Sequence, residues 1–217
     1  NQIPVKGSTE SEDSEITLQG VSSIYTRAFN GCTKLSSIKL VDNNGDVLAK
    51  CNDNKTLYFP SSLKTLAAVG SGDTYKAFSG IAAETLRIGK NVTGIGAEAF
   101  LNTKNLKSVI FEDIAQSKLG FLGSKVFAGC TSLTSFVFPD SVYEINTSLF
   151  YNCSNLVSVH LPEVNNIIGG NKPASNYTTI KENMFEGCTK LEEINIPSTI
   201  SKISKKSFSG CSSLAEL

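Results

Sequence analysis

The chain has 217 residues, which is long enough to bury a substantial hydrophobic core in one elongated domain or two small ones. Lysine plus arginine and aspartate plus glutamate each number 20, so the protein lacks the net positive field that nucleic-acid and anionic-membrane binders use. Hydrophobic residues make up 40% of the chain, which excludes a disordered polymer.

The first 15 residues lack the periodic apolar pattern of the rest of the chain, so residues 1–15 are expected to form an N-terminal tail. They also lack the charged leader and apolar stretch of a signal peptide, and no apolar run approaches the roughly 18 residues of a membrane-spanning helix. We therefore expect a protein that is not membrane-embedded and, if it is exported, one whose signal was removed ahead of Asn1.

Residues 16–217 repeat one short motif. In its clearest copy Phe127 is followed by Cys130 at plus 3, Leu133 at plus 6, Phe136 at plus 9 and Phe138 at plus 11. The positions equivalent to Phe127, here called anchors, are Phe29, Leu48, Phe78, Phe100, Phe127, Phe150, Phe185 and Phe208. Their spacings are 19, 30, 22, 27, 23, 35 and 23 residues, which predicts about eight repeats of about 23 residues with insertions, the last one incomplete.

Each repeat predicts one short strand, because apolar residues at plus 9 and plus 11 alternate with mostly polar ones at plus 8 and plus 10. A partial copy with Ile16 and Leu18 precedes the first anchor. An isoleucine five positions before an anchor predicts a second short extended segment, at Ile24, Ile95, Ile145, Ile180 and Ile203.

The corners of each repeat also follow a pattern. The stretch that leads into an anchor, such as 96–100, is expected to hold a single helical turn, and a glycine at plus 2 allows the chain to leave it. These glycines are Gly31, Gly129, Gly187 and Gly210. A polar residue three positions after plus 11 is expected to form hydrogen bonds with backbone groups at the next corner; these residues are Asn43, Ser62, Asn91, Ser141 and Thr199.

The combined pattern Ile-x-x-x-x-Phe-x-Gly-Cys-x-x-Leu-x-x-Ile-x-Ile-Pro resembles the BspA-like leucine-rich-repeat family over nearly all of 16–217, with departures at Leu48, Ile81 and Thr103. A 23-residue unit cannot bury its apolar side alone, so the units must stack. We expect a right-handed leucine-rich-repeat solenoid, mostly β with short helical turns, whose parallel strands stack one per repeat. The resemblance implies a surface or secreted protein of anaerobic bacteria or protist parasites that acts in adhesion or host-protein binding.

All six cysteines occupy the plus 3 position: Cys32, Cys51, Cys130, Cys153, Cys188 and Cys211. Because Ile81 stands at the same position in another copy, we interpret the thiols as small buried apolar groups. Disulfides between neighbouring repeats, such as Cys130 with Cys153, are the alternative, although parallel side chains on adjacent strands fit the disulfide dihedral poorly. No Cys-x-x-Cys pattern or histidine cluster indicates a metal site, and we expect no cofactor.

His160 is the single histidine, so any triad or His-dependent metal site must use it. It falls on the outward face of its predicted strand beside Ser158, where an ordinary surface residue explains it without catalysis. Glu192 and Glu193 have no second carboxylate pair opposite them in the pattern and are expected at a solvated edge. We therefore predict that the protein is not an enzyme.

The outward strand positions form two columns on the concave strand face that we expect to bind a partner. The plus 8 column consists of Ser37, Thr56, Thr85, Ser108, Ser135, Ser158 and Glu193. The plus 10 column, our predicted ligand-binding set, consists of Lys39, Tyr58, Arg87, Ile110, Val137, His160 and Asn195. The longest insertion, 164–179, is a second candidate, because a loop held by a rigid scaffold often carries function.

Two functions remain open. The first is a binding or adhesion module at the cell surface or outside the cell, whose partner is a host or matrix protein or a surface glycan. The alternative is a structural spacer or stalk that carries another domain. Nucleic acid is not an expected partner, and the sequence does not define an oligomeric state.

Overall fold

A computed structural model describes residues 56–59, 61, 63–64, 76–162 and 178–216 in full. For the strands at 15–19, 23–24, 37–41, 47–49 and 65–66 it describes the backbone. The statements below concern these residues.

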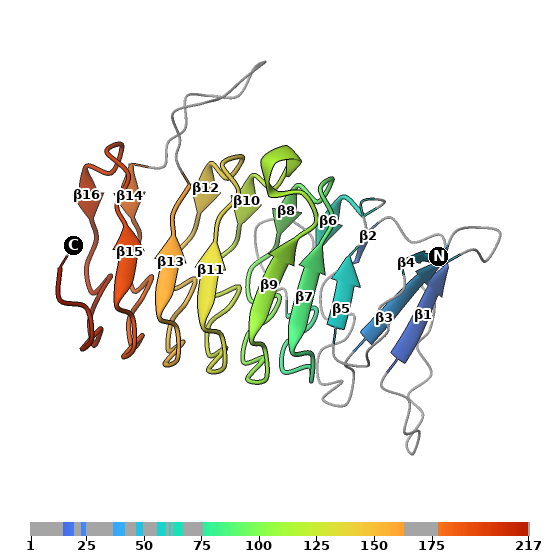
Figure 1. Cartoon of the computed structure of the whole chain (residues 1–217), viewed down its shortest axis with the longest axis horizontal. Coiled ribbons are helices and arrows are strands. Elements are labelled where there is room, and N and C mark those ends of the chain that lie inside the picture. The colour runs from blue at the N-terminus through green and yellow to red at the C-terminus, as the bar shows by residue number, and fades with distance from the viewer. Residues whose placement is uncertain are drawn as a thin grey trace.

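The predicted plus 8 to plus 11 strands form one row along the long axis of the molecule (Figure 1). The row consists of β1 (Glu15–Gln19), β3 (Ser37–Val41), β5 (Thr56–Phe59), β7 (Thr85–Ile88), β9 (Ser108–Phe111), β11 (Ser135–Val137), β13 (Ser158–His160) and β15 (Glu193–Asn195). The pairs are parallel and join equivalent repeat positions, as where Leu86 of β7 lies opposite Val109 of β9. Ile16 of β1 lies opposite Ile38 of β3, which confirms the partial first copy.

A second row of two-residue strands confirms the predicted extended segments before the anchors. It contains a five-stranded parallel sheet of β2 (Ser23–Ile24), β6 (Thr65–Leu66), β8 (Gly94–Ile95), β10 (Phe121–Leu122) and β12 (Glu144–Ile145), and a pair of β14 (Thr179–Ile180) with β16 (Lys202–Ile203). Leu122 of β10 pairs with Ile95 and Ile145. Leucine therefore takes the isoleucine position in this repeat, which the sequence pattern had not identified.

Phenylalanine rings form the centre of the core between the two rows. Phe100, Phe127, Phe150 and Phe185 are fully buried, and neighbouring rings stack at 5.8 or 5.9 Å with interplanar angles of 7 to 13°. Phe78 extends the column at one end and Phe208 at the other. The anchors of successive repeats thus fill one continuous column, as the stacking argument predicts.

The plus 3 position has a second role beyond packing. The Sγ atoms of Cys130, Cys153, Cys188 and Cys211 donate to the carbonyl of the preceding anchor at 3.3, 3.1, 3.2 and 3.1 Å, and Thr103 Oγ1 donates in the same way to Phe78 at 3.3 Å. These four cysteines are free thiols, and the first three are buried. The interpretation as buried groups is confirmed for these three, but the position also favours a side chain that can donate a hydrogen bond. Cys32 and Cys51 lie outside the described residues.

The corner before each anchor differs from the prediction. Residues 96–100 form hydrogen-bonded turns and not a helix, because Glu98 adopts a left-handed φ of 58°. The residues at minus 2 in the later repeats do the same, with φ between 56 and 60°: Lys125, Ser148, Asn183 and Lys206. Gly129, Gly187 and Gly210 are left-handed and allow the exit as predicted, and Gly31 lies outside the described residues. Gly80, Asn102 and Asn152 take the same conformation at plus 2 in the other three described repeats.

The polar corner residues follow the prediction in part. Asn91 Nδ2 donates to the Ser61 carbonyl at 3.0 Å and Ser141 Oγ donates to the Leu119 carbonyl at 2.8 Å. Thr199 Oγ1 is buried without a hydrogen-bond partner, so the prediction is wrong there. Asn43 and Ser62 lie outside the described residues.

The repeat anchored at Leu48 is also different. Leu48 lies within β4 (Val47–Ala49), which pairs antiparallel with β3 and forms a hairpin in place of an anchor turn. The helix of the described residues is η1 (Ile114–Gln116), a 3-10 turn between β9 and β10. No helix in this part of the chain has the length and apolar character to cross a membrane.

Candidate binding face

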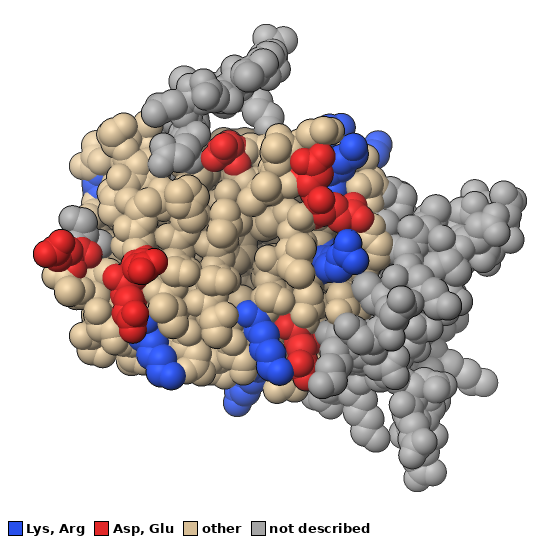
Figure 2. Space-filling view, viewed as in Figure 1, with Lys and Arg blue, Asp and Glu red and all other residues tan. Residues whose placement is uncertain are grey.

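The outward side chains of the first strand row form what we call the strand face. Figure 2 looks onto this face and shows charged side chains along its margins and a hollowed centre without them. Of the predicted plus 10 column, Arg87 and His160 are exposed, and Ile110 and Val137 are 47% and 49% exposed. Tyr58 and Asn195 are half-buried. The side chain of Lys39 lies outside the described residues.

At the β5 end, the predicted ligand residues are tied to one another. The Arg87 guanidinium lies over the Tyr58 ring, 5.3 Å from its centroid, as a cation–π pair. The Tyr58 hydroxyl donates to Glu112, and Ser61 Oγ donates to the other carboxylate oxygen at 3.1 Å. Partial burial raises the pKa of the Glu112 carboxyl. Glu112 follows β9 directly, and sequence reasoning had missed it because only the fold brings it beside Tyr58.

In the middle of the face, β9 and β11 lie side by side but belong to different hydrogen-bonded sheets. We call this interruption the seam. A hollow of about 250 Å³ lies on it, lined by Ser108, Val109, Ile110, Phe111, Ile114, Ser135 and Val137. None of these residues is charged, and Ile114 of η1 is 42% exposed beside Ile110 and Val137. The seam falls in the repeat whose anchors are 27 residues apart, the one that contains η1.

At the β15 end, a second hollow of about 550 Å³ lies between the outward side chains of β11, β13 and β15. Val137 and His160 line it, together with the acidic residues Glu192, Glu193 and Glu216. The pair Glu192 and Glu193 thus lies at an exposed edge as predicted, but with a third carboxylate from the C-terminal turn. We call this the acidic hollow.

Asn195 has a structural task in addition to its place in the column. Its Oδ1 accepts from the Leu161 backbone N–H at 2.5 Å, and its Nδ2 donates to the Leu161 carbonyl at 3.2 Å. The amide therefore satisfies both backbone groups of the residue that follows β13. This pairing explains why an asparagine occupies that position.

The plus 8 column is less exposed than predicted. Thr56 is buried, with 7% exposure, so the expectation that it faces solvent is wrong. Ser108 Oγ donates to Thr85 Oγ1 at 3.2 Å, so hydroxyls of adjacent strands pair with each other. Ser135 and Glu193 are exposed.

Ser158 lies two residues before His160 on β13, and within the described residues no side-chain hydrogen bond joins the two, so the structure shows no serine–histidine pair of the kind a triad needs. Within the described residues, no group of three or more His, Cys, Asp or Glu side chains could hold a metal ion.

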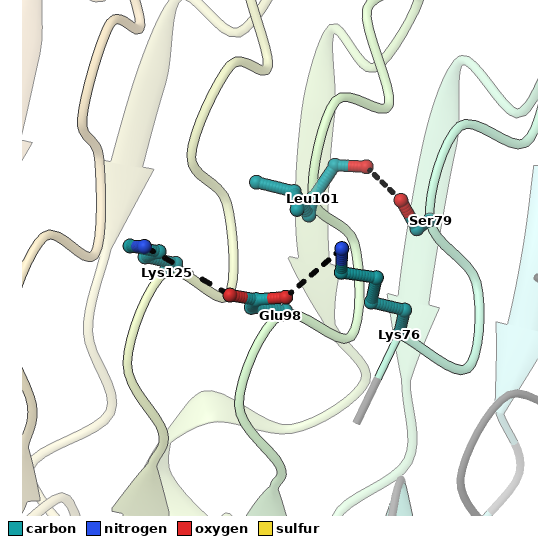
Figure 3. A network of polar contacts seen from close by, with 5 residues as sticks. All are labelled: Lys76, Ser79, Glu98, Leu101 and Lys125. Atoms are coloured by element: carbon teal, nitrogen blue, oxygen red, sulfur yellow. Dashed lines mark hydrogen bonds and ion pairs between the residues drawn. The ribbon is translucent and has the colours of Figure 1, made fainter. Parts of the chain in front are cut away.

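Away from the strand face, a charged network spans three neighbouring turns at the minus 2 position (Figure 3). Glu98 lies between Lys76 at 3.5 Å and Lys125 at 3.9 Å, and its side chain is 12% exposed. Nearby, Ser79 Oγ donates to the Leu101 carbonyl of the next turn at 2.8 Å. These contacts join adjacent repeats and leave the carboxylate already paired, so we interpret the network as structural. The insertion 164–179 lies almost entirely outside the described residues.

Comparison with known proteins matches this architecture. The model of a family described as BspA type Leucine rich repeat region matches residues 8–69 and 74–215 in six copies. No curated protein sequence matches the chain. A leucine-rich repeat protein of T. pallidum has a similar structure, with a TM-score of 0.67 and 24% identity over 94% of this chain and 80% of that one.

Two further solved structures are similar. A leucine-rich cell surface protein of Faecalibacterium prausnitzii has a TM-score of 0.56 and 22% identity over 78% of this chain, which spans 48% of that protein. A leucine-rich repeat protein of Eubacterium ventriosum has a TM-score of 0.58 and 20% identity over 94% of this chain and 60% of that one. At these identities the likeness concerns the fold.

Proposed function

Because the chain belongs to the BspA-type leucine-rich repeat family, we propose that it is a non-catalytic binding module of a cell-surface or secreted protein, using the strand face of a right-handed solenoid. Proteins of this family generally bind proteins or serve structural roles and are generally not enzymes. The F. prausnitzii protein of similar fold is a cell surface protein, which supports the proposed location.

The observation that carries the proposal is the uncharged centre of the strand face. Ile110 and Val137 are about half exposed there, on strands whose inward side chains pack in or against the core. Phe136 of β11 is 2% exposed, and Val109 and Phe111 of β9 are partly buried against the core. Exposed apolar side chains on a buried, stacked scaffold are already held in place, so a partner would bind them with little loss of conformational entropy.

Within the predicted plus 10 column we assign partner contact to Arg87, Ile110, Val137 and His160. Tyr58 and Asn195 have structural contacts instead: the Tyr58 ring packs against the Arg87 guanidinium, and the Asn195 amide forms hydrogen bonds with the backbone of Leu161 after β13. The partner would be a host or matrix protein or a surface glycan.

The test is a binding assay of the purified chain on immobilised collagen, immobilised laminin and a glycan array. The variant with Ile110→Asp and Val137→Asp should lose binding to any surface that retains the natural chain. Ile203→Asp on β16 is the matched control, because Ile203 is also 49% exposed but lies in the second strand row. If nothing is retained, or if the double variant binds like the control, the spacer function is correct instead.

A further inference from the structure

The seam hollow and the acidic hollow adjoin, because Val137 lines both. Resting on the proposed function, we propose that the partner is a protein whose extended segment places an apolar side chain in the seam and a lysine or arginine side chain in the acidic hollow. The segment would run across strands β11, β13 and β15.

The seam selects an apolar side chain. Its seven lining residues carry no charge, and their two polar side chains are serines, so a charged group placed there would lose water without gaining a partner. Its volume of about 250 Å³ is below the range of about 300–1,000 Å³ typical of small-molecule sites, which suits a side chain of a larger partner.

The acidic hollow selects a cation. The ion pairs within the described chain involve Glu84, Glu98 and Glu186, and none of them involves Glu192, Glu193 or Glu216. Three carboxylates that take no part in these ion pairs attract a positively charged group and repel an anionic one. The exposed Val137 offers an apolar surface to the methylene stem of a lysine or arginine.

Geometry sets the spacing of the two side chains. Adjacent strands lie roughly 5 Å apart, so the seam hollow between β9 and β11 and the acidic hollow centred on β13 lie about 7–8 Å apart. An extended chain rises about 3.3 Å per residue and places alternate side chains on one face. The apolar and basic residues of the partner should therefore be about two positions apart. Sulfated or sialylated glycans are disfavoured, because their charges would face Glu192, Glu193 and Glu216.

The probe is a random peptide library displayed on phage and selected against the immobilised natural chain. The enriched peptides should carry an aliphatic or aromatic residue about two positions from a lysine or arginine. As synthetic fluorescent peptides, they should bind roughly tenfold more weakly to Val137→Ser and to the double variant Glu192→Lys, Glu193→Lys, as expected for truncating or reversing one central contact. Selection against the double variant should enrich acidic peptides instead.

The controls are Ile203→Ser, which removes an equally exposed apolar side chain, and Glu182→Lys, which reverses an exposed charge beyond β14. Both should bind the peptides like the natural chain, and the thermal unfolding of all variants should be compared. No enrichment, enrichment without a basic residue, or peptide binding unaffected by Val137→Ser would each overturn the inference. A separate outcome is that the natural chain is retained on collagen, laminin or a glycan and that the Ile110→Asp, Val137→Asp variant loses that retention. Such retention together with any of these results would leave the proposed function intact and reject only the polypeptide segment.

Discussion

Phe150 is the most informative side chain for testing how the repeats hold together. Its ring is fully buried and stacks on Phe127 and Phe185 at 5.9 and 5.8 Å, and it meets the edge of Phe136 at 5.2 Å. Phe150→Ala removes contacts to the repeats on both sides. Phe208→Ala is the matched control, because Phe208 is half-buried and stacks, among the described rings, on Phe185.

The magnitude follows from these environments. A fully buried phenylalanine replaced by alanine costs about 3–5 kcal/mol, since the transfer free energy is lost and a cavity remains. The column cannot close that cavity easily, because each turn is fixed to its neighbours by backbone hydrogen bonds, such as Phe150 N–H to the Met184 carbonyl at 3.0 Å. Phe208→Ala should cost about 1–2 kcal/mol, because the ring is already partly solvated and only one stacking contact among the described rings is lost.

The free energy of unfolding should be measured by urea denaturation followed by circular dichroism, with the slope of the transition checked for each variant. We expect Phe150→Ala to lose the low-urea half of the unfolding transition, or to shift the transition midpoint at least twice as far as Phe208→Ala does. Equal shifts for the two variants would refute the stacked column as the main source of stability.

Three further predictions follow from the thiols and the corner glycines. In the native protein Cys211 should react before Cys153 with a thiol reagent at pH 8, because Cys211 is half-buried and burial raises its pKa only to about 11, whereas Cys153 should react at the rate of unfolding; equal rates would contradict this order. Burial raises the pKa of Cys153 above the ordinary value of 9.0, so the folded state keeps a proton that the unfolded state loses. Its contribution to stability is complete below pH 9 and falls by up to about 1.4 kcal/mol per pH unit above it, and Cys153→Thr should show a correspondingly shallower decline in alkaline denaturation. Gly187→Ala should destabilise by more than about 1 kcal/mol in the same urea assay, because Gly187 has a φ of 80° and a Cβ there would lie 2.2 Å from Asn152 Oδ1; a neutral effect would show that the turn relaxes.

The repeat pattern predicted the fold well because each apolar position in it has one environment. In every described repeat except the last, the phenylalanine at the anchor is buried. Where one of these repeats has a leucine at plus 6, that leucine is buried too, as with Leu133 and Leu191. Spacing alone was misleading at Leu48, where the apolar residue belongs to a hairpin with β3. It also suggested a helical turn before each anchor, because a left-handed residue such as Glu98 carries no compositional mark.

The cysteines show a second limit of pattern reading. A buried position that accepts Cys, Ile and Thr looks apolar on average. The structure shows that Cys and Thr share a donor that adds a second hydrogen bond to the preceding anchor carbonyl, as Cys153 does for Phe127 and Thr103 for Phe78. That carbonyl belongs to another repeat, so this bond is not visible within one copy of the motif.

The seam depends on a departure from the repeat. A perfectly periodic stack would continue the hydrogen-bonded ladder through β9 and β11 and leave no hollow between them. The added residues that contain η1 coincide with the interruption, and they place Ile114 beside Ile110 and Val137. The acidic hollow, by contrast, follows from regular stacking, because Glu193 and Glu216 both stand at plus 8, in the last two repeats. The regular repeats therefore align the carboxylates, and the irregular repeat adds the apolar hollow beside them.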